Sequence, residues 1–139
     1  MILRYLADSE ATGEFGAELW TLLPTSALVF LHGDLGAGKT TLVRAYLRAG
    51  GFDGPVKSPT YNLVEEYHIG ERKVLHFDLY RLIDPEELEW MGIRDYFAEA
   101  CVCFIEWPDK GNGFLPEPDF IISLSIEGNG RQIQLETCH

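Results

Sequence analysis

The sequence lacks the long apolar stretches that membrane insertion requires. None of its apolar runs approaches the ~20 residues that span a bilayer, and residues 1–8 turn acidic too soon for a secretory signal. Cysteine is also scarce: Cys101, Cys103 and Cys138 show neither C-x-x-C spacing nor the histidine spacing of a zinc site. An odd count of this kind also argues against a disulfide framework. These absences predict a cytoplasmic protein with no membrane segment.

Basic residues are the second shortage. The 11 Lys and Arg stand against 22 Asp and Glu, so the formal net charge is −11 and the pI is near 4.6. A protein that binds the phosphates of a nucleic acid needs a basic surface patch. We therefore expect weak binding to free nucleic acid. The acidity has two interpretations of equal weight: it keeps the protein soluble, or it suits docking on a basic protein surface.

A glycine-rich motif is the most informative feature that is present. Residues 33–40 read Gly-Asp-Leu-Gly-Ala-Gly-Lys-Thr, a full match to G-x-x-x-x-G-K-[ST]. A β-prone run, 27–32, precedes it and a helix-compatible run, 41–47, follows, which is the context this phosphate-binding loop (P-loop) needs. Its glycines let successive N–H groups surround a phosphate, its lysine supplies charge to the β- and γ-phosphates, and its threonine hydroxyl can ligate Mg²⁺. The predicted nucleotide contacts are Gly33, Gly36, Ala37, Gly38, Lys39, Thr40 and Thr41.

Two apolar runs end in an acid that could serve the same site. Asp78 follows Val-Leu-His-Phe and Glu106 follows Val-Cys-Phe-Ile, and parallel strands direct their carboxyl ends toward the bound phosphates. We expect Thr40 and Glu106 to hold Mg²⁺, because the Glu106 strand is the more apolar, and Asp78 to orient water or support the metal ligands. The two acids could exchange these roles. With Lys39 they form the predicted catalytic set.

The segment Ser58-Pro59-Thr60 lies between the P-loop helix and the next predicted strand. NTPases commonly place there a hydroxyl-bearing segment that senses the γ-phosphate. These three residues are therefore candidates for a switch, although an ordinary Ser-Pro turn would read the same way.

The remaining pattern predicts one domain over residues 1–139, since no repeat, low-complexity stretch or linker interrupts it. The expected strands are 2–5, 27–32, 63–69, 73–78, 102–106, 120–126 and 132–136. The expected helices are 9–23, 40–49, one that begins at 84–85 and breaks at Gly92, and a short one that reaches 98. This order predicts an α/β fold: a P-loop NTPase-like three-layer sandwich whose mixed sheet has a parallel centre and antiparallel additions.

Five motifs together resemble one family. They are Gly-Asp-Leu-Gly-Ala-Gly-Lys-Thr-Thr (33–41), Lys-Ser-Pro-Thr-Tyr (57–61), His-Phe-Asp-Leu-Tyr-Arg (76–81), Asp-Pro-Glu-Glu-Leu (84–88) and Ile-Glu-Trp-Pro (105–108). In this order and spacing they look like the TsaE family, also called YjeE, the bacterial ATPase of threonylcarbamoyladenosine synthesis.

The resemblance implies ATP as the nucleotide and the TsaB–TsaD complex as the protein partner, with tRNA contacted only indirectly. Hydrolysis would serve the multi-turnover cycle of tRNA modification. The resemblance also implies that Lys39 and Thr40 contact phosphate and Mg²⁺, that Glu106 is a metal-binding or catalytic acid, and that Asp78 is a further essential acid. Trp107 would lie near the nucleotide, or else close the sheet edge as a core residue.

Three rival functions share the P-loop. A GTPase would need Asn-Lys-x-Asp, and Asp-Lys-Gly-Asn at 109–112 is not that motif. A small-molecule kinase usually has a basic lid, whereas Arg81, Arg94 and Arg131 are scattered along the sequence. A nucleotide-gated adaptor would bind ATP without turnover. For the ATPase we expect slow hydrolysis alone and a docking face near 58–61 and the acidic helix 85–91.

Overall fold

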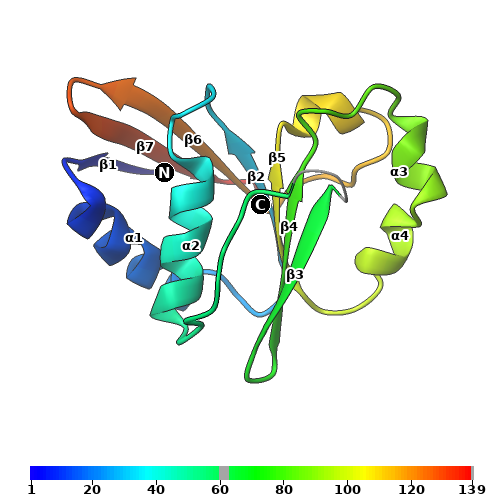
Figure 1. The fold of residues 1–139 in the computed structure, drawn as a ribbon, viewed down its shortest axis with the longest axis horizontal. Helices are drawn as coiled ribbons and strands as arrows, with labels where there is room; N and C mark the ends of the chain where they lie inside the picture. Colours follow the sequence, from blue (N-terminus) through cyan, green and yellow to red (C-terminus); the bar gives the residue numbers. More distant parts are fainter. Residues whose placement is uncertain (60–62, 139) are drawn as a thin grey trace.

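The computed structural model describes residues 1–59 and 63–138, and within them one seven-stranded sheet carries the fold (Figure 1). The strands are β1 (Ile2–Leu6), β2 (Ala27–His32), β3 (Val64–Ile69), β4 (Arg72–Asp78), β5 (Val102–Glu106), β6 (Phe120–Glu127) and β7 (Gly130–Thr137). The helices are α1 (Ser9–Leu22), α2 (Lys39–Ala49), α3 (Glu86–Trp90), α4 (Ile93–Tyr96) and the 3-10 helix η1 (Pro108–Gly111). Every predicted element is present, with bounds within two residues of the prediction.

The strand order is β1-β7-β6-β2-β5-β4-β3. The four inner strands, β6, β2, β5 and β4, run parallel to one another, whereas the pairs β1–β7, β7–β6 and β4–β3 are antiparallel. This arrangement confirms the predicted α/β fold with a parallel centre and antiparallel additions. The parallel centre matters for function, because it brings the carboxyl ends of β2, β5 and β4 to one edge.

Helices cover both faces of the sheet, as predicted. Along β5, Val102 and Phe104 belong to the core under α1 and α2, while Cys103 and Ile105 belong to the core under α3 and α4. Because successive side chains on a strand point to opposite faces, a strand buried on both sides must be apolar throughout. That requirement explains the uninterrupted apolar run from which β5 was predicted.

Local caps explain where the first and third helices begin. The Asp8 carboxylate accepts the Ala11 N–H at 2.9 Å and caps α1. Before α3, the Asp84 carboxylate accepts the Glu86 N–H at 3.0 Å and the Glu87 carboxylate reaches back to the Asp84 N–H at 3.3 Å. These two reciprocal bonds lie at the predicted helix start, 84–85, and the helix itself begins at Glu86.

One glycine sets the distance between α1 and α2. A Cβ atom built on Gly16 would lie 2.5 Å from the backbone carbon of Ala45, a separation that real Cβ atoms do not reach. The two helices are therefore in backbone contact at this point, and only glycine fits there. In the part of the chain that the structure describes, no helix is long and apolar enough to cross a membrane.

Candidate nucleotide-binding site

The P-loop connects β2 to α2 at the carboxyl edge of the sheet (Figure 1). Gly36 and Gly38 have φ angles of 81° and 102°, which side chains with a Cβ rarely adopt. Gly38 is also the N-cap of α2 and offers no side chain to cap it. The first N–H groups of the eleven-residue helix α2 are therefore turned toward the loop, which is the usual arrangement for binding a phosphate.

Lys39 begins α2 and is almost fully buried at 5% exposure. Its ammonium donates to the Gly33 carbonyl and lies 4.0 Å from the ring centroid of Trp107. Burial lowers its pKa from the ordinary value, while the nearby carboxylates of Glu106, Asp78 and Asp34 act in the opposite direction. The amine is thus held beside the loop by a carbonyl and an aromatic face, within reach of the predicted phosphate position.

Trp107 contacts both a P-loop residue and the core. Its ring faces Lys39, lies tilted with its centroid 5.0 Å from that of the Tyr80 ring, and also packs against the core under α3 and α4. The residue has a φ of 57°, an uncommon conformation for a residue with a side chain. This backbone turn directs the ring across the sheet edge toward the P-loop.

Glu106 ends β5 and is 3% exposed. Its Oε2 atom accepts a hydrogen bond from the Thr40 hydroxyl at 3.1 Å and lies 2.5 Å from Nε2 of His76 on β4. The structure therefore joins the two predicted metal-binding residues, which are 66 positions apart in the chain. A buried carboxylate needs such partners, because burial without hydrogen bonds disfavours its charged form.

Asp78 ends β4 directly beside Glu106 in the parallel register. Its Oδ2 accepts the Ser58 hydroxyl at 2.9 Å and its Oδ1 accepts the Tyr80 N–H at 3.0 Å. The predicted switch residue Ser58 is therefore in contact with the second acid. Pro59 is buried next to it, and Thr60, the third predicted switch residue, lies outside the described residues.

Most of the predicted residues line one cavity of about 300 Å³. Its lining is Leu35, Gly36, Gly38, Lys39, Thr40, Thr41, Ser58, Asp78, Glu106, Trp107 and Arg131. Gly33, Ala37 and Pro59 were predicted for the site and do not line this cavity. Ala37 has its methyl group buried, and Gly33 takes part through the carbonyl that holds Lys39.

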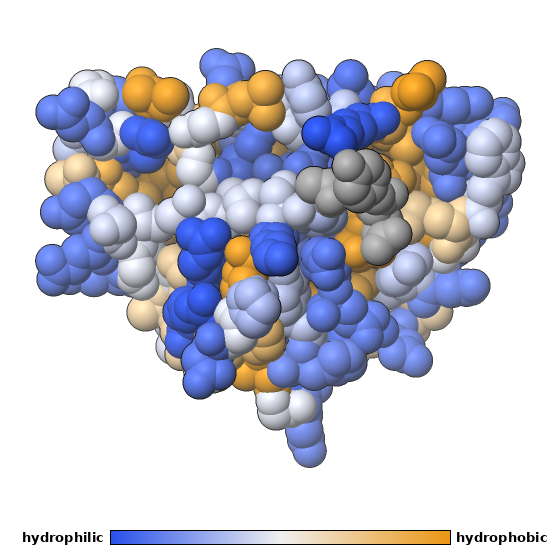
Figure 2. All heavy atoms as spheres, viewed as in Figure 1, coloured by the Kyte–Doolittle hydropathy of each residue, from blue (hydrophilic) through white to orange (hydrophobic). Residues whose placement is uncertain are grey.

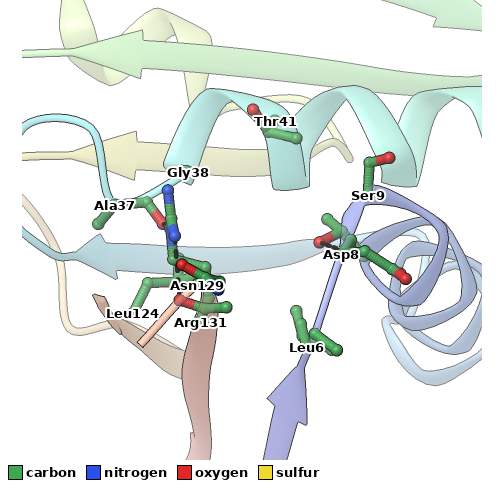
Figure 3. Close-up of a pocket in the computed structure, with 12 residues that line it drawn as sticks. Leu6, Asp8, Ser9, Ala37, Gly38, Thr41, Leu124, Asn129 and Arg131 are labelled. Carbon is green, nitrogen blue, oxygen red and sulfur yellow. Dashed lines mark hydrogen bonds between the residues drawn. The ribbon is translucent and has the colours of Figure 1, made fainter. Parts of the chain in front are cut away.

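A second pocket of about 200 Å³ adjoins the first at the start of α2 (Figure 3). It shares Gly38, Thr41 and Arg131 with the first cavity. Leu6, Asp8 and Ser9 approach it from the end of β1 and the start of α1, and Leu124 and Asn129 approach it from the β6–β7 hairpin. The pocket therefore lies between the P-loop and the amino-terminal end of α1.

Arg131 on β7 is a site residue that the sequence interpretation missed. Its Nε donates to the Ala37 carbonyl at 2.9 Å and one terminal nitrogen donates to the Gly36 carbonyl at 3.2 Å. The guanidinium thus holds the carbonyls of two neighbouring P-loop residues, Gly36 and Ala37. The sequence analysis noted Arg131 only as one of several arginines scattered along the chain, because its contact across 94 residues follows from the β7 register and no local pattern reports it.

His76 is the second residue without a predicted role. It stands two positions before Asp78 and so shares that acid's face of β4. This alternation was the available indication that His76 might belong to the site. Its contact with Glu106 depends on the pairing of β4 with β5, which the chain order does not specify.

Three comparisons with known proteins find similar chains. The model of the family described as "Threonylcarbamoyl adenosine biosynthesis protein TsaE" matches residues 6–133. A TsaE protein of Haemophilus influenzae is 50% identical over 139 residues, covering 96% of this chain and 88% of that protein. One of Aquifex aeolicus is 33% identical over 133 residues, covering 94% and 92%. Both carry the name tRNA threonylcarbamoyladenosine biosynthesis protein. The crystal structure of Bacillus subtilis YdiB shares the fold, with a TM-score of 0.82 at 24% identity over 99% of this chain and 86% of that one.

Proposed function

We propose a function from one premise: this chain belongs to the TsaE family. It acts as the ATP-binding and ATP-hydrolysing component of bacterial tRNA N⁶-threonylcarbamoyladenosine synthesis, docks on TsaB–TsaD and supports the multi-turnover cycle. One observation carries this proposal. Several P-loop residues, among them Lys39 and Thr40, line the same cavity as the two strand-end acids and a residue of the predicted switch, Ser58.

The triphosphate binds where the P-loop N–H groups and the start of α2 converge. Lys39 exchanges its contacts with the Gly33 carbonyl and the Trp107 ring for the β- and γ-phosphates. The exchange is favourable because a phosphate offers charge that a carbonyl and an aromatic face lack. Arg131 keeps the loop in shape from behind by holding the carbonyls of Gly36 and Ala37.

The nucleoside occupies the second pocket (Figure 3). This pocket adjoins the phosphate cavity through Gly38 and Thr41, so a single nucleotide can span both. Its lining combines apolar side chains, Leu6 and Leu124, with polar groups such as Asn129. Such a mixture suits a planar base with a polar edge.

The residues present fit Mg²⁺. Thr40 and Glu106 offer adjacent oxygen atoms, the ligand type that Mg²⁺ prefers, and Asp78 faces the same cavity. Within residues 1–59 and 63–138, no group of three or more His, Cys, Asp or Glu side chains could hold a metal by itself. Such a site suits an ion that takes its other ligands from phosphates and water. When bound, Mg²⁺ neutralises charge on the β- and γ-phosphates.

Glu106 provides a buried carboxylate that accepts a hydrogen bond from Thr40. Asp78, which accepts a hydrogen bond from Ser58, orients the attacking water near the γ-phosphate. The loop N–H groups and Lys39 stabilise the charge that develops on the phosphoryl oxygens. The chain presents no arginine from its own described residues in the position of a finger, since Arg131 is engaged with the loop. We therefore expect slow hydrolysis by the isolated protein.

The docking face comprises α3 and the loop that leads into it. Ile83 and Trp90 are 93% and 72% exposed, and Figure 2 shows apolar groups at this upper right corner among hydrophilic ones. The acids Glu86, Glu87 and Glu89 border them. Leu88 points into the core instead, as predicted. An apolar contact ringed by acids suits a partner surface that is basic.

The first experiment measures ATP hydrolysis with and without TsaB–TsaD. Lys39→Ala removes the cation between the phosphates, and we expect a loss on the order of 3 kcal/mol, roughly a hundredfold in rate. Lys73→Ala is the matched control, because Lys73 pairs with exposed acids at the far end of β4. Near-normal turnover in Lys39→Ala would refute the site. ATP binding without turnover under either condition would favour the adaptor, and phosphate transfer to an acceptor would favour the kinase.

The second experiment tests the docking face. Trp90→Ala should weaken binding to TsaB–TsaD several-fold while ATP hydrolysis by the isolated protein stays unchanged, and binding of the wild type should weaken as salt rises. Leu3→Ala on β1, which is also exposed to solvent but lies on the opposite flank, should have no effect. Tight binding of free tRNA together with indifference to TsaB–TsaD would overturn the partner and leave the ATP site intact.

A further inference from the structure

His76 is a fully buried histidine that touches the acid of the proposed ATP site. Its exposure is 0%, and its Nε2 atom lies 2.5 Å from Oε2 of Glu106. Its other ring nitrogen, Nδ1, is the buried side-chain polar atom without a hydrogen-bond partner among the described residues. A histidine buried in this way, with one nitrogen engaged and one left bare, requires a physical reason.

The contact with Glu106 defines which ring nitrogen of His76 acts as the donor. A carboxylate can only accept, so the proton of the shared bond resides on Nε2 of His76. The other ring nitrogen, Nδ1, has no hydrogen-bond partner among the described residues. In this geometry His76 acts as a donor from Nε2 to the carboxylate of Glu106.

This donor completes the support of the carboxylate. Oε2 of Glu106 receives one bond from Thr40 on α2 and one from His76 on β4, so two different elements hold the same atom. Oε1 receives no hydrogen bond from the described residues and remains available to the cavity that Glu106 lines. With one oxygen held from two directions, the carboxylate cannot rotate without breaking a buried hydrogen bond.

We propose that His76 is a positioning residue: it donates through Nε2 to Glu106 and thereby keeps the free carboxylate oxygen directed at the metal and phosphate cavity. The proposal rests on the function proposed above. Groups that orient metal ligands from behind typically contribute 10–100-fold to metal affinity or activity, and His76 has the geometry of such a group.

Two variants separate positioning from packing. His76→Leu removes the donor and keeps a similar volume, whereas His76→Gln places an amide N–H near the position of the imidazole Nε2. We expect His76→Leu to raise the Mg²⁺ concentration for half-maximal ATP hydrolysis at least tenfold. Its affinity for ATP without Mg²⁺ should stay within about twofold of the wild type, because the phosphate contacts of the P-loop are unchanged. His76→Gln should restore most of the Mg²⁺ response, and His68→Leu, an exposed histidine on β3, should match the wild type.

A measurement on the metal-free and nucleotide-free protein tests the same geometry. Imidazole ¹⁵N spectra, with the signal of His76 assigned by its loss in His76→Gln, should show a proton on Nε2. A ring that carries its proton on Nδ1 alone would overturn the proposal, even if His76→Leu fails to fold. So would an unchanged Mg²⁺ response in a folded His76→Leu, or equal defects in the Leu and Gln variants. Absence of ATP turnover in the wild type would instead refute the proposed function. The spectra would still show whether His76 donates its Nε2 proton to Glu106.

Discussion

The ends of β4 and β5 carry two acids that look alike and are held differently. Asp78 and Glu106 are paired in register, each at the end of an apolar strand. Glu106 is buried and takes its hydrogen bonds from regular elements, through Thr40 on α2 and His76 on β4. Asp78 is half-buried and takes its bonds from Ser58, in a stretch without helix or strand, and from the turn after its own strand.

This difference teaches how one sheet edge can serve two purposes. The partners of Glu106 belong to the rigid frame around the P-loop, so its position depends on the frame. The partners of Asp78 belong to loops, so its position depends on the segment that the sequence suggested as a switch. The buried acid is thus suited to a fixed metal or charge role, and the half-buried acid to a role that follows the state of the loop.

The largest effect should come from Glu106→Gln. The amide keeps the shape of the side chain but loses its charge, so ATP binding should persist while hydrolysis falls about a hundredfold or more. Phosphate release together with calorimetric ATP titration measures both quantities. Glu127→Gln, at the exposed end of β6, is the control for the change in charge. Wild-type turnover in Glu106→Gln would remove the distinction between the two acids.

Asp78→Asn should have a smaller effect, roughly tenfold in turnover, because a half-buried acid with loop partners contributes less fixed charge. Its defect should respond to Mg²⁺ differently from that of Glu106→Gln. Steady-state rates across a Mg²⁺ titration test this, with the exposed Asp53→Asn as control. If Asp78→Asn proves the more damaging of the two and abolishes the Mg²⁺ response, the roles of the two acids are exchanged.

Ser58→Ala should have the smallest effect, a few-fold loss of turnover, since it removes only the hydroxyl that reaches Asp78. In the Asp78→Asn background the same change should add little, because residues that act through one contact are not additive. The double-mutant cycle is measured by phosphate release, and the exposed Ser125→Ala on β6 is the control. Full additivity of the two changes would show that Ser58 does not act through the acid.

The fold was predictable because its evidence is local. The uninterrupted apolar run before Glu106 indicated a strand buried on both faces, and the P-loop motif set the strand, loop and helix around it. The two acids were also predictable, since each ends such a run. Their neighbours depend on which strands pair.

The contacts of His76 and Arg131 could not be read from the chain, because they span 30 and 94 residues. Such contacts arise from the strand order, in which β5 inserts between β2 and β4 while β7 turns back beside β6. Local residue patterns do not encode that order. The division of labour between Asp78 and Glu106 was left open for the same reason: burial and partners distinguish them, and both are properties of the assembled sheet.

The backbone contact between Gly16 and Ala45 has a consequence for the length of the ligand that the proposed site can accept. The start of α1 lines the proposed nucleoside pocket and the start of α2 forms the phosphate loop, so the contact ties the two ends of the site together. At this point the two helices leave no room for a side chain at position 16. We therefore expect the distance between the proposed nucleoside pocket and the phosphate loop to be fixed, so that it restricts the length of the nucleotide that fits.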